Sequence, residues 1–164
     1  MFEIINNLLS EDEKKFLQDK CDNFKIFDIP NAYNDYVRNG IDTTNYLLEY
    51  QIKVIDYLYN RFKLNYKITG IWINKVSNET NKSDDYHHDV CNFTIITYLN
   101  DNFENGEFVY FDENNKQVLI KPKKDMCIIQ NNKLRHKVNP VTNGVRYSLI
   151  TFINFVDKDI KTLL

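Results

Sequence analysis

The chain has 164 residues, of which 43% are hydrophobic and 27% are charged, and its formal net charge is -2. This length fits a single domain, and the composition is that of an ordinary globular protein. The small net charge gives no reason to expect nucleic acid or an acidic membrane surface as an obligatory partner.

We expect neither a signal peptide nor a membrane-spanning segment in this sequence. No apolar run reaches membrane-spanning length, and Met1–Ser10 lacks the basic start of a signal peptide. The three cysteines, Cys21, Cys91 and Cys127, form no C-x-x-C pair, which excludes a zinc ribbon and a thioredoxin motif. We therefore expect a soluble cytoplasmic protein with free thiols.

The first third of the chain is predicted to be helical. Ser10 followed by Glu13 is a capping box, which predicts a helix ending near Asp22. A second helix is expected over Thr44–Phe62, and the polar stretch 30–42 between the two helices is expected to be a loop. The apolar residues at helical spacing in the second helix are Leu47, Ile55, Leu58 and Phe62.

From Lys67 onward, short runs rich in Ile, Val, Phe and Tyr alternate with Asn- and Gly-containing turns. Many short strands after a helical lead-in predict a double-stranded β-helix (jelly roll) of two antiparallel sheets, with helices packed on one sheet. An immunoglobulin-like sandwich is the competing all-β fold, but its Cys…Trp…Cys framework is missing. We expect one domain, 1–164, with mostly helical support in 1–66 and the jelly-roll core in 67–156. The predicted strands are Ile68–Val76, Phe93–Leu99, Glu107–Phe111, Gln117–Lys121, Met126–Gln130, Arg135–Val138 and Val145–Phe155.

The chain has three histidines, and two of them stand next to each other in the sequence Tyr86-His87-His88-Asp89. If this segment is a strand, His87 and Asp89 point to the same face and His88 points away, toward the surface. His136 lies in another predicted strand, which a jelly roll can bring close. Two imidazoles and one carboxylate on one face are the ligands of a non-haem iron(II) site. H-x-D alone is a weak signal, and a lone histidine is more often structural.

Arg146 and Ser148 raise the specificity of this pattern. They follow His136 by ten and twelve residues and share one face of a predicted strand. The planar guanidinium of arginine binds carboxylates through two nitrogens. Because Arg146 stands among apolar residues, its charge needs a partner, which a bound dicarboxylate would supply.

Together these motifs resemble the 2-oxoglutarate/Fe(II)-dependent oxygenases, and within them the prolyl 4-hydroxylase-like branch. The segments Thr97–Asp101 and Asn105–Phe108 are similar to that branch's Y-L-N-D … G-G-E segment, with Asn105 in place of the first glycine. Val138 and Pro140 fit the segment after its distal histidine, and Leu8–Glu13 looks like its first helix. The resemblance covers most of the chain and is strongest from Tyr86 to Phe155.

The resemblance implies that His87, Asp89 and His136 are both the iron ligands and the catalytic centre. It implies Fe(II), 2-oxoglutarate as co-substrate, O2, and stimulation by ascorbate. The implied reaction hydroxylates an unactivated C–H bond and releases succinate and CO2. The family's Tyr-x-x-Gly is missing from the strand before the metal motif, where Asn74 is a candidate replacement. The residues implied to bind or line the co-substrate site are Arg146, Ser148, Tyr98, Ile96, Val138 and Phe152.

Three other classes of protein remain open at this point. A cupin-type iron dioxygenase that needs no 2-oxoglutarate would leave Arg146 without a carboxylate to bind. A non-enzymatic jelly-roll binding module would make the histidines structural. A zinc hydrolase could use the same three ligands, with Glu107 as the nearest candidate for its general base.

The substrate expected first is a peptidyl proline in a peptide or protein, with a free amino acid second and a nucleic-acid base third. Acidic residues gather in 84–115 and basic residues in 116–137, which would suit an extended charged polypeptide or simply reflect solvated strand edges. Tyr33, Tyr36 and Arg38 in the loop 30–42 could stack on a proline ring or on a base. That loop and the loop 78–85 are the candidates to close over a substrate.

Overall fold

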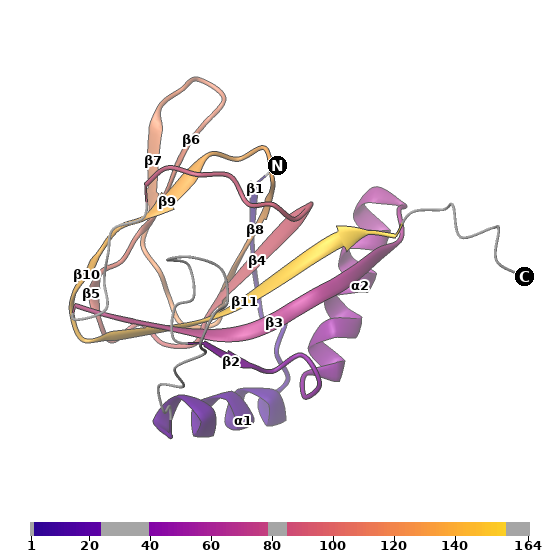
Figure 1. Ribbon diagram of the computed structural model, residues 1–164, viewed down its shortest axis with the longest axis horizontal. Coiled ribbons are helices and arrows are strands. Elements are labelled where there is room, and N and C mark those ends of the chain that lie inside the picture. Colours follow the sequence, from indigo (N-terminus) through magenta and orange to yellow (C-terminus); the bar gives the residue numbers. More distant parts are fainter. Residues whose placement is uncertain (1, 24–39, 79–84, 157–164) are drawn as a thin grey trace, which may run out of the picture.

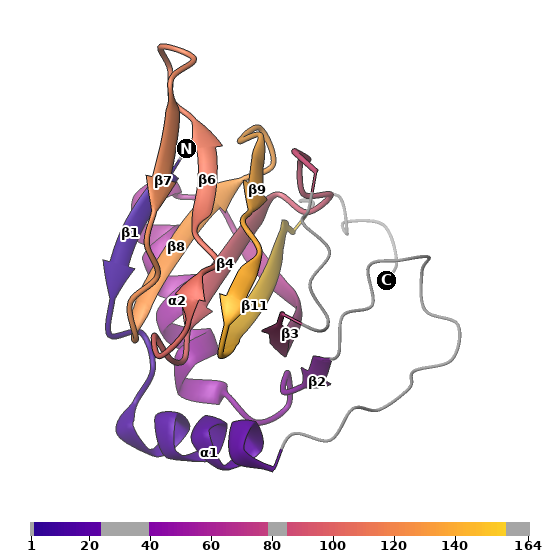
Figure 2. The ribbon, with the colours of Figure 1, turned by 90° about the vertical axis from the view of Figure 1, so that its left-hand side faces the viewer.

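The computed structural model describes residues 2–23, 40–78 and 85–156. Most of the two loops expected to close over a substrate, including Tyr33, Tyr36 and Arg38, lies outside these residues. The structure is a pair of facing antiparallel β-sheet layers with two helices behind one of them (Figures 1 and 2). This is the jelly roll that the sequence predicts.

The larger layer is a six-stranded sheet with the strand order β1-β8-β4-β11-β3-β2, in which every neighbouring pair is antiparallel. The facing layer consists of the three-stranded sheet β7-β6-β9 and the two-stranded sheet β10-β5. The strands of the larger sheet are β1 Phe2–Asn6, β2 Gly40–Asp42, β3 Tyr66–Ser77, β4 Phe93–Tyr98, β8 Met126–Asn131 and β11 Val145–Phe155. The strands of the facing layer are β5 Glu104–Asn105, β6 Phe108–Phe111, β7 Gln117–Ile120, β9 His136–Val138 and β10 Val141–Asn143.

Both helices, α1 (Glu11–Asp22) and α2 (Leu48–Phe62), lie on the outer face of the six-stranded sheet (Figure 2). Their buried side chains, including Leu17, Val54 and Leu58, join those of the central strands in one apolar cluster. Burial of each such side chain stabilises the fold by about 1.5–3 kcal/mol. No helix in the described part of the chain has both the length and the apolarity to cross a membrane.

The second helix begins at Leu48, so the prediction that it starts at Thr44 is wrong. The Thr44 hydroxyl accepts a hydrogen bond from the Ile71 backbone N–H at 2.9 Å, and the Tyr46 N–H donates to the Thr43 carbonyl at 3.0 Å. These bonds hold the segment as a turn against β3. The end of the expected loop 30–42 is also not a loop, because Gly40–Asp42 pairs with β3 as an edge strand.

A second apolar cluster lies between the two sheet layers. Its buried members include Ile96, Phe108 and Ile128, and Val138 and Ile150 pack against them. This cluster does not fill the interlayer space completely. At one side it gives way to the polar residues that form the candidate site.

Candidate active site

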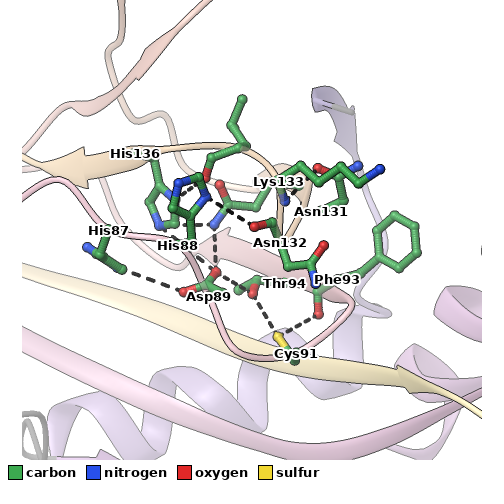
Figure 3. A network of polar contacts seen from close by, with 12 residues as sticks. His87, His88, Asp89, Cys91, Phe93, Thr94, Asn131, Asn132, Lys133 and His136 are labelled. Carbon is green, nitrogen blue, oxygen red and sulfur yellow. Dashed lines mark hydrogen bonds and ion pairs between the residues drawn. The ribbon is translucent and has the colours of Figure 1, made fainter.

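His87 and His136 are held next to each other by backbone hydrogen bonds. The N–H of each residue donates to the carbonyl of the other, at 2.9 and 3.0 Å, in an isolated β-bridge. Asp89 lies beside both rings, with Oδ1 3.8 Å from His87 Nε2 and Oδ2 3.9 Å from His136 Nε2 (Figure 3). One potential ligand atom from each residue lies within 4.8 Å of the others, a spacing that one metal ion can bridge.

The H-x-D segment does not lie in a regular strand, contrary to the expectation from sequence. Only His87 forms a bridge, and Asp89 lies in an irregular stretch before β4. The two side chains converge because the backbone bridge fixes His87 and side-chain hydrogen bonds fix Asp89. His88 is exposed, as expected, and its Nδ1 lies 3.1 Å from the Asn132 carbonyl (Figure 3).

The hydrogen bonds of the two imidazoles set their tautomers. His87 Nδ1 lies 2.9 Å from the Asp85 carbonyl, and His136 Nδ1 lies 3.1 Å from the Leu134 carbonyl. A carbonyl only accepts, so each Nδ1 carries the proton and each Nε2 presents its lone pair toward the site. Burial lowers the pKa of His136, while the Asp89 charge opposes this shift, and a neutral ring is the form that binds metal.

The three side chains stand at one end of a cavity of about 240 Å³ between the sheet layers. Residues directly opposite each other in the six-stranded sheet form its floor in rows. Phe152 and Thr94 make the row beside the histidines, and the next row is the apolar set Trp72, Ile150 and Ile96. The third row is polar and consists of Asn74, Ser148 and Tyr98.

Arg146 lies beyond the polar row and is only 3% exposed. Its Nη1 donates to the Gly106 carbonyl at 3.1 Å, and its Nε has no hydrogen-bond partner in residues 2–23, 40–78 and 85–156. Burial lowers the pKa of Arg146, and nearby Tyr98 opposes that shift. No carboxylate of the described residues pairs with this guanidinium. A buried cation without a counter-ion points to an anionic ligand.

The turn that brings the Gly106 carbonyl to Arg146 uses left-handed backbone at two consecutive residues. Asn105 has φ 61° and Gly106 has φ 72°. Asparagine and glycine adopt this conformation more readily than other residues. The departure of Asn105 from the expected glycine is therefore compatible with the turn.

Tyr98 and Ser148 are each 1% exposed and are direct neighbours across β4 and β11. Burial raises the pKa of Tyr98 to about 12, so its hydroxyl is protonated near neutral pH and can donate to an anion. Ile96, Val138 and Phe152 line the same cavity, as expected.

Asn74 also lines the cavity. It is 5% exposed, and within the part of the chain that the structure describes its Oδ1 has no hydrogen-bond partner. Two further residues, Thr94 and Gln130, donate hydrogen bonds to Asp89, which the sequence reasoning did not predict. Strand alternation places Thr94 on the same face as Ile96 and Tyr98, but it gives no sign of the contact with Asp89. Glu107 accepts from Asn139 at 3.1 Å and does not line the cavity, so the zinc hydrolase gains no general base.

Comparison with protein families decides the class. The model of the 2OG-Fe(II) oxygenase superfamily matches residues 72–154, just over half of the chain. This chain belongs to the 2OG-Fe(II) oxygenase superfamily. The matched segment contains the three candidate metal ligands, His87, Asp89 and His136. It also contains Tyr98, Arg146 and Ser148. A comparison with curated proteins finds no match.

Solved structures of other 2OG-Fe(II) oxygenases share the fold. A viral collagen prolyl hydroxylase from Paramecium bursaria Chlorella virus-1, in complex with 2OG, is 19% identical with a TM-score of 0.68, over 93% of this chain and 94% of that one. A prolyl hydroxylase from Trichoplax adhaerens, in complex with a peptide fragment of hypoxia inducible factor, is 19% identical with a TM-score of 0.68, over 96% and 84% of the two chains.

An oxidoreductase of the 2OG-Fe(II) oxygenase family from Burkholderia pseudomallei is 22% identical, with a TM-score of 0.55, over 62% of this chain. The match spans about half of that protein, 51% of its length. At these identities the structural likeness establishes the fold. Fe(II) and 2-oxoglutarate are the cofactors that membership of the superfamily implies, and the cavity offers a ligand set of suitable chemistry for each.

Proposed function

We propose that this oxygenase hydroxylates an unactivated C–H bond, with His87, Asp89 and His136 holding Fe(II) and Arg146 binding 2-oxoglutarate. The balanced reaction is R–H + O2 + 2-oxoglutarate → R–OH + succinate + CO2. The observation that carries the proposal is one cavity with a two-histidine, one-carboxylate cluster at one end and an unpaired buried arginine at the other. A cupin-type dioxygenase without 2-oxoglutarate gives Arg146 no anion.

The metal end of the cavity suits a divalent ion with borderline ligand preference. It presents two neutral imidazole nitrogens and one carboxylate on the same side, which is the ligand set of non-haem iron oxygenases. When bound there, iron would supply the oxygen activation that no side chain can perform. The protein would contribute orientation, exclusion of water and protection from side reactions.

The far end suits the distal carboxylate of 2-oxoglutarate. The Arg146 guanidinium would supply the positive charge, and the hydroxyls of Ser148 and Tyr98 would each donate one hydrogen bond. The apolar row between the two ends, together with Val138, would contact the methylene groups. The amide of Asn74 lies beside Ser148 in the polar row and would complete the set of hydrogen-bonding groups.

The proposed substrate is a proline residue in a peptide or protein. The similar fold of the collagen and Trichoplax prolyl hydroxylases supports this choice, and the latter was solved with a bound peptide. Within the cavity, Trp72 and Phe152 form an edge-to-face pair with ring centroids 4.7 Å apart, an apolar wall that a pyrrolidine ring could contact. A free amino acid is the second candidate and a nucleic-acid base the third.

Two measurements test the proposal. Anaerobic titration of the protein with Fe(II) and 2-oxoglutarate should produce the visible charge-transfer band of a chelated keto-acid, and no band in the Arg146→Ala variant at the same concentrations. Incubation with Fe(II), ascorbate, 2-oxoglutarate and proline-rich peptides should release succinate and add one oxygen atom to proline. Free amino acids and methylated oligonucleotides are the parallel substrates. Oxygen found on either of these alone would overturn the peptidyl-proline assignment and leave the oxygenase assignment standing.

A further inference from the structure

Two donors from neighbouring strands hold one oxygen of Asp89. Thr94 Oγ1 donates to Oδ2 at 2.5 Å, and Gln130 Nε2 donates to the same atom at 2.8 Å (the Thr94 contact is drawn in Figure 3). Thr94 on β4 and Gln130 on β8 are directly opposite in the sheet register, so the two donors approach the carboxylate together. Oδ1 receives no hydrogen bond from the described residues and lies on the side of His87 Nε2.

Gln130 lowers the stability of the fold at this position. It is 1% exposed, and its Oε1 has no hydrogen-bond partner among the described residues. A buried polar atom without a partner costs about 1–3 kcal/mol, so a hydrophobic residue would give a more stable strand. The contact that Gln130 makes with Asp89 therefore comes at the expense of stability.

The same Gln130 Nε2 also lies 3.1 Å from His136 Nε2. That imidazole nitrogen has one lone pair, which can accept from Gln130 or bind a metal ion, but cannot do both. Asp89 Oδ2 has room for both of its donors, whether or not Oδ1 is a ligand. Of the two contacts that Gln130 Nε2 makes, the one with Asp89 is therefore compatible with a metal ion in the site, and the one with His136 is not.

We propose that Gln130 and Thr94 are positioning residues that restrain the Asp89 carboxylate so that it offers only Oδ1 to the metal. Without them the carboxylate could turn about its Cβ–Cγ bond or engage the ion with both oxygens, which would take up a position needed by other ligands. This inference rests on the proposed metal site and deepens it. Outer partners of this kind typically contribute 10- to 100-fold in metal affinity.

The test measures the dissociation constant of Mn(II), a stand-in for Fe(II) that avoids oxidation, by competition with a chelator. Gln130→Met and Thr94→Val each remove one donor at similar volume and should weaken Mn(II) binding about 10- to 100-fold. Thr94→Ser keeps the hydroxyl and should bind Mn(II) close to the wild-type level. Far-UV circular dichroism and the thermal midpoint establish that each variant is folded.

The matched control is Thr97→Val. Thr97 lies on β4 directly opposite Cys127 on β8, and its hydroxyl contacts Cys127 Sγ at 3.2 Å, so this pair mirrors Thr94 and Gln130 on the opposite face of the sheet. Removal of the Thr97 hydroxyl should leave the Mn(II) affinity unchanged. An equal loss of affinity in Thr97→Val and Thr94→Val would overturn the proposal, because the effect would then be a general one.

The design separates this inference from the proposed function. Wild-type affinity in both Gln130→Met and Thr94→Val, with binding lost in His136→Ala, would overturn the positioning role and leave the metal site intact. Wild-type affinity in His136→Ala would instead overturn the metal site itself. If Gln130→Met does not fold, the pair Thr94→Val and Thr94→Ser decides the question, since a loss that serine restores requires the hydroxyl donor.

Discussion

At the scale of single residues, the candidate metal site has no spare ligand. Within the described part of the chain, His87, Asp89 and His136 form the single cluster of its kind. We predict that alanine at any of the three weakens Mn(II) or Fe(II) binding by more than the roughly 10- to 100-fold typical of residues that only support a ligand, since each of the three is itself a ligand. Bound metal after desalting is the measurement. His88→Ala is the control, because its side chain is exposed and bonds to Asn132, and it should retain the metal.

Arg146 is expected to dominate co-substrate affinity. Arg146→Ala should raise the 2-oxoglutarate dissociation constant about 10- to 150-fold, whereas Ser148→Ala and Tyr98→Phe should each raise it about 2- to 10-fold. The guanidinium–carboxylate pair adds charge attraction to its hydrogen bonds and contributes about 1.5–3 kcal/mol, whereas each hydroxyl supplies one uncharged donor and contributes about 0.5–1.5 kcal/mol. Anaerobic titration at fixed metal concentration gives these constants. A constant that is the same in wild type and Arg146→Ala would show that the anion binds elsewhere.

The pH dependence of this affinity follows from Tyr98. Burial raises the pKa of Tyr98 to about 12, so the hydroxyl keeps its proton throughout the accessible alkaline range. Wild type and Tyr98→Phe should therefore show the same pH profile of 2-oxoglutarate binding between about pH 7 and pH 10. A loss of affinity with an alkaline midpoint in wild type alone would contradict this description of Tyr98.

At the scale of elements, one glutamate caps both helices. Glu13 Oε2 accepts from the Ser10 N–H at 2.9 Å in the capping box of α1, and its Oε1 accepts from the Tyr50 N–H in the first turn of α2 at 2.8 Å. The N-cap of α2, Leu47, has no capping side chain of its own. Glu13 is 7% exposed and thus joins the two helices that cover the sheet.

We predict that Glu13→Ala lowers the free energy of unfolding by about 2–4 kcal/mol, because it leaves two partly or fully buried N–H groups without acceptors. Ser10→Ala should cost about 1 kcal/mol, the usual contribution of a cap. Urea unfolding followed by circular dichroism measures both. Glu11→Ala is the control. The contact of Glu11 with Lys14 is on the surface, so the stability of this variant should match that of wild type. Equal stability of the Glu11 and Glu13 variants would disprove the shared cap.

At the scale of the whole molecule, residues 1–66 supply more than helical support. They contribute β1 and β2, the two outer strands of the six-stranded sheet, in addition to both helices. The helix–sheet cluster draws its buried side chains from both parts of the chain. Neither part can then bury its apolar surface without the other.

We therefore predict a single cooperative unfolding transition for the whole chain, with the calorimetric enthalpy equal to the van't Hoff enthalpy. Mn(II) should move this transition to higher temperature, because a ligand that binds only the folded state stabilises it by RT ln(1 + [L]/Kd). His136→Ala should unfold at the same temperature with and without Mn(II). Two separate transitions in calorimetry would indicate that 1–66 and 67–156 fold as independent units.

The sequence by itself determined the class of fold, seven of the eleven strands in the described part of the chain, and the class of enzyme. Alternation and turn residues are local signals, so Val145–Phe155 was predicted with its exact bounds. H-x-D, the distal histidine and R-x-S carry their chemistry in residue type and spacing, and the family match confirms that class. The strands β2, β5 and β10 were missed because two or three residues show no period, and the five-residue strand β1 was missed because its partner β8 lies far away in the chain.

Tertiary structure alone decided how these groups act together. The two imidazoles converge through backbone hydrogen bonds between residues 49 positions apart, and Asp89 joins them from an irregular stretch and not through the strand alternation considered for H-x-D. The unpaired guanidinium of Arg146 and the amide of Gln130 at Asp89 depend on which residues stand opposite in the sheet. Sheet register is a relation between distant segments, set by packing of the whole core, and no local pattern contains it.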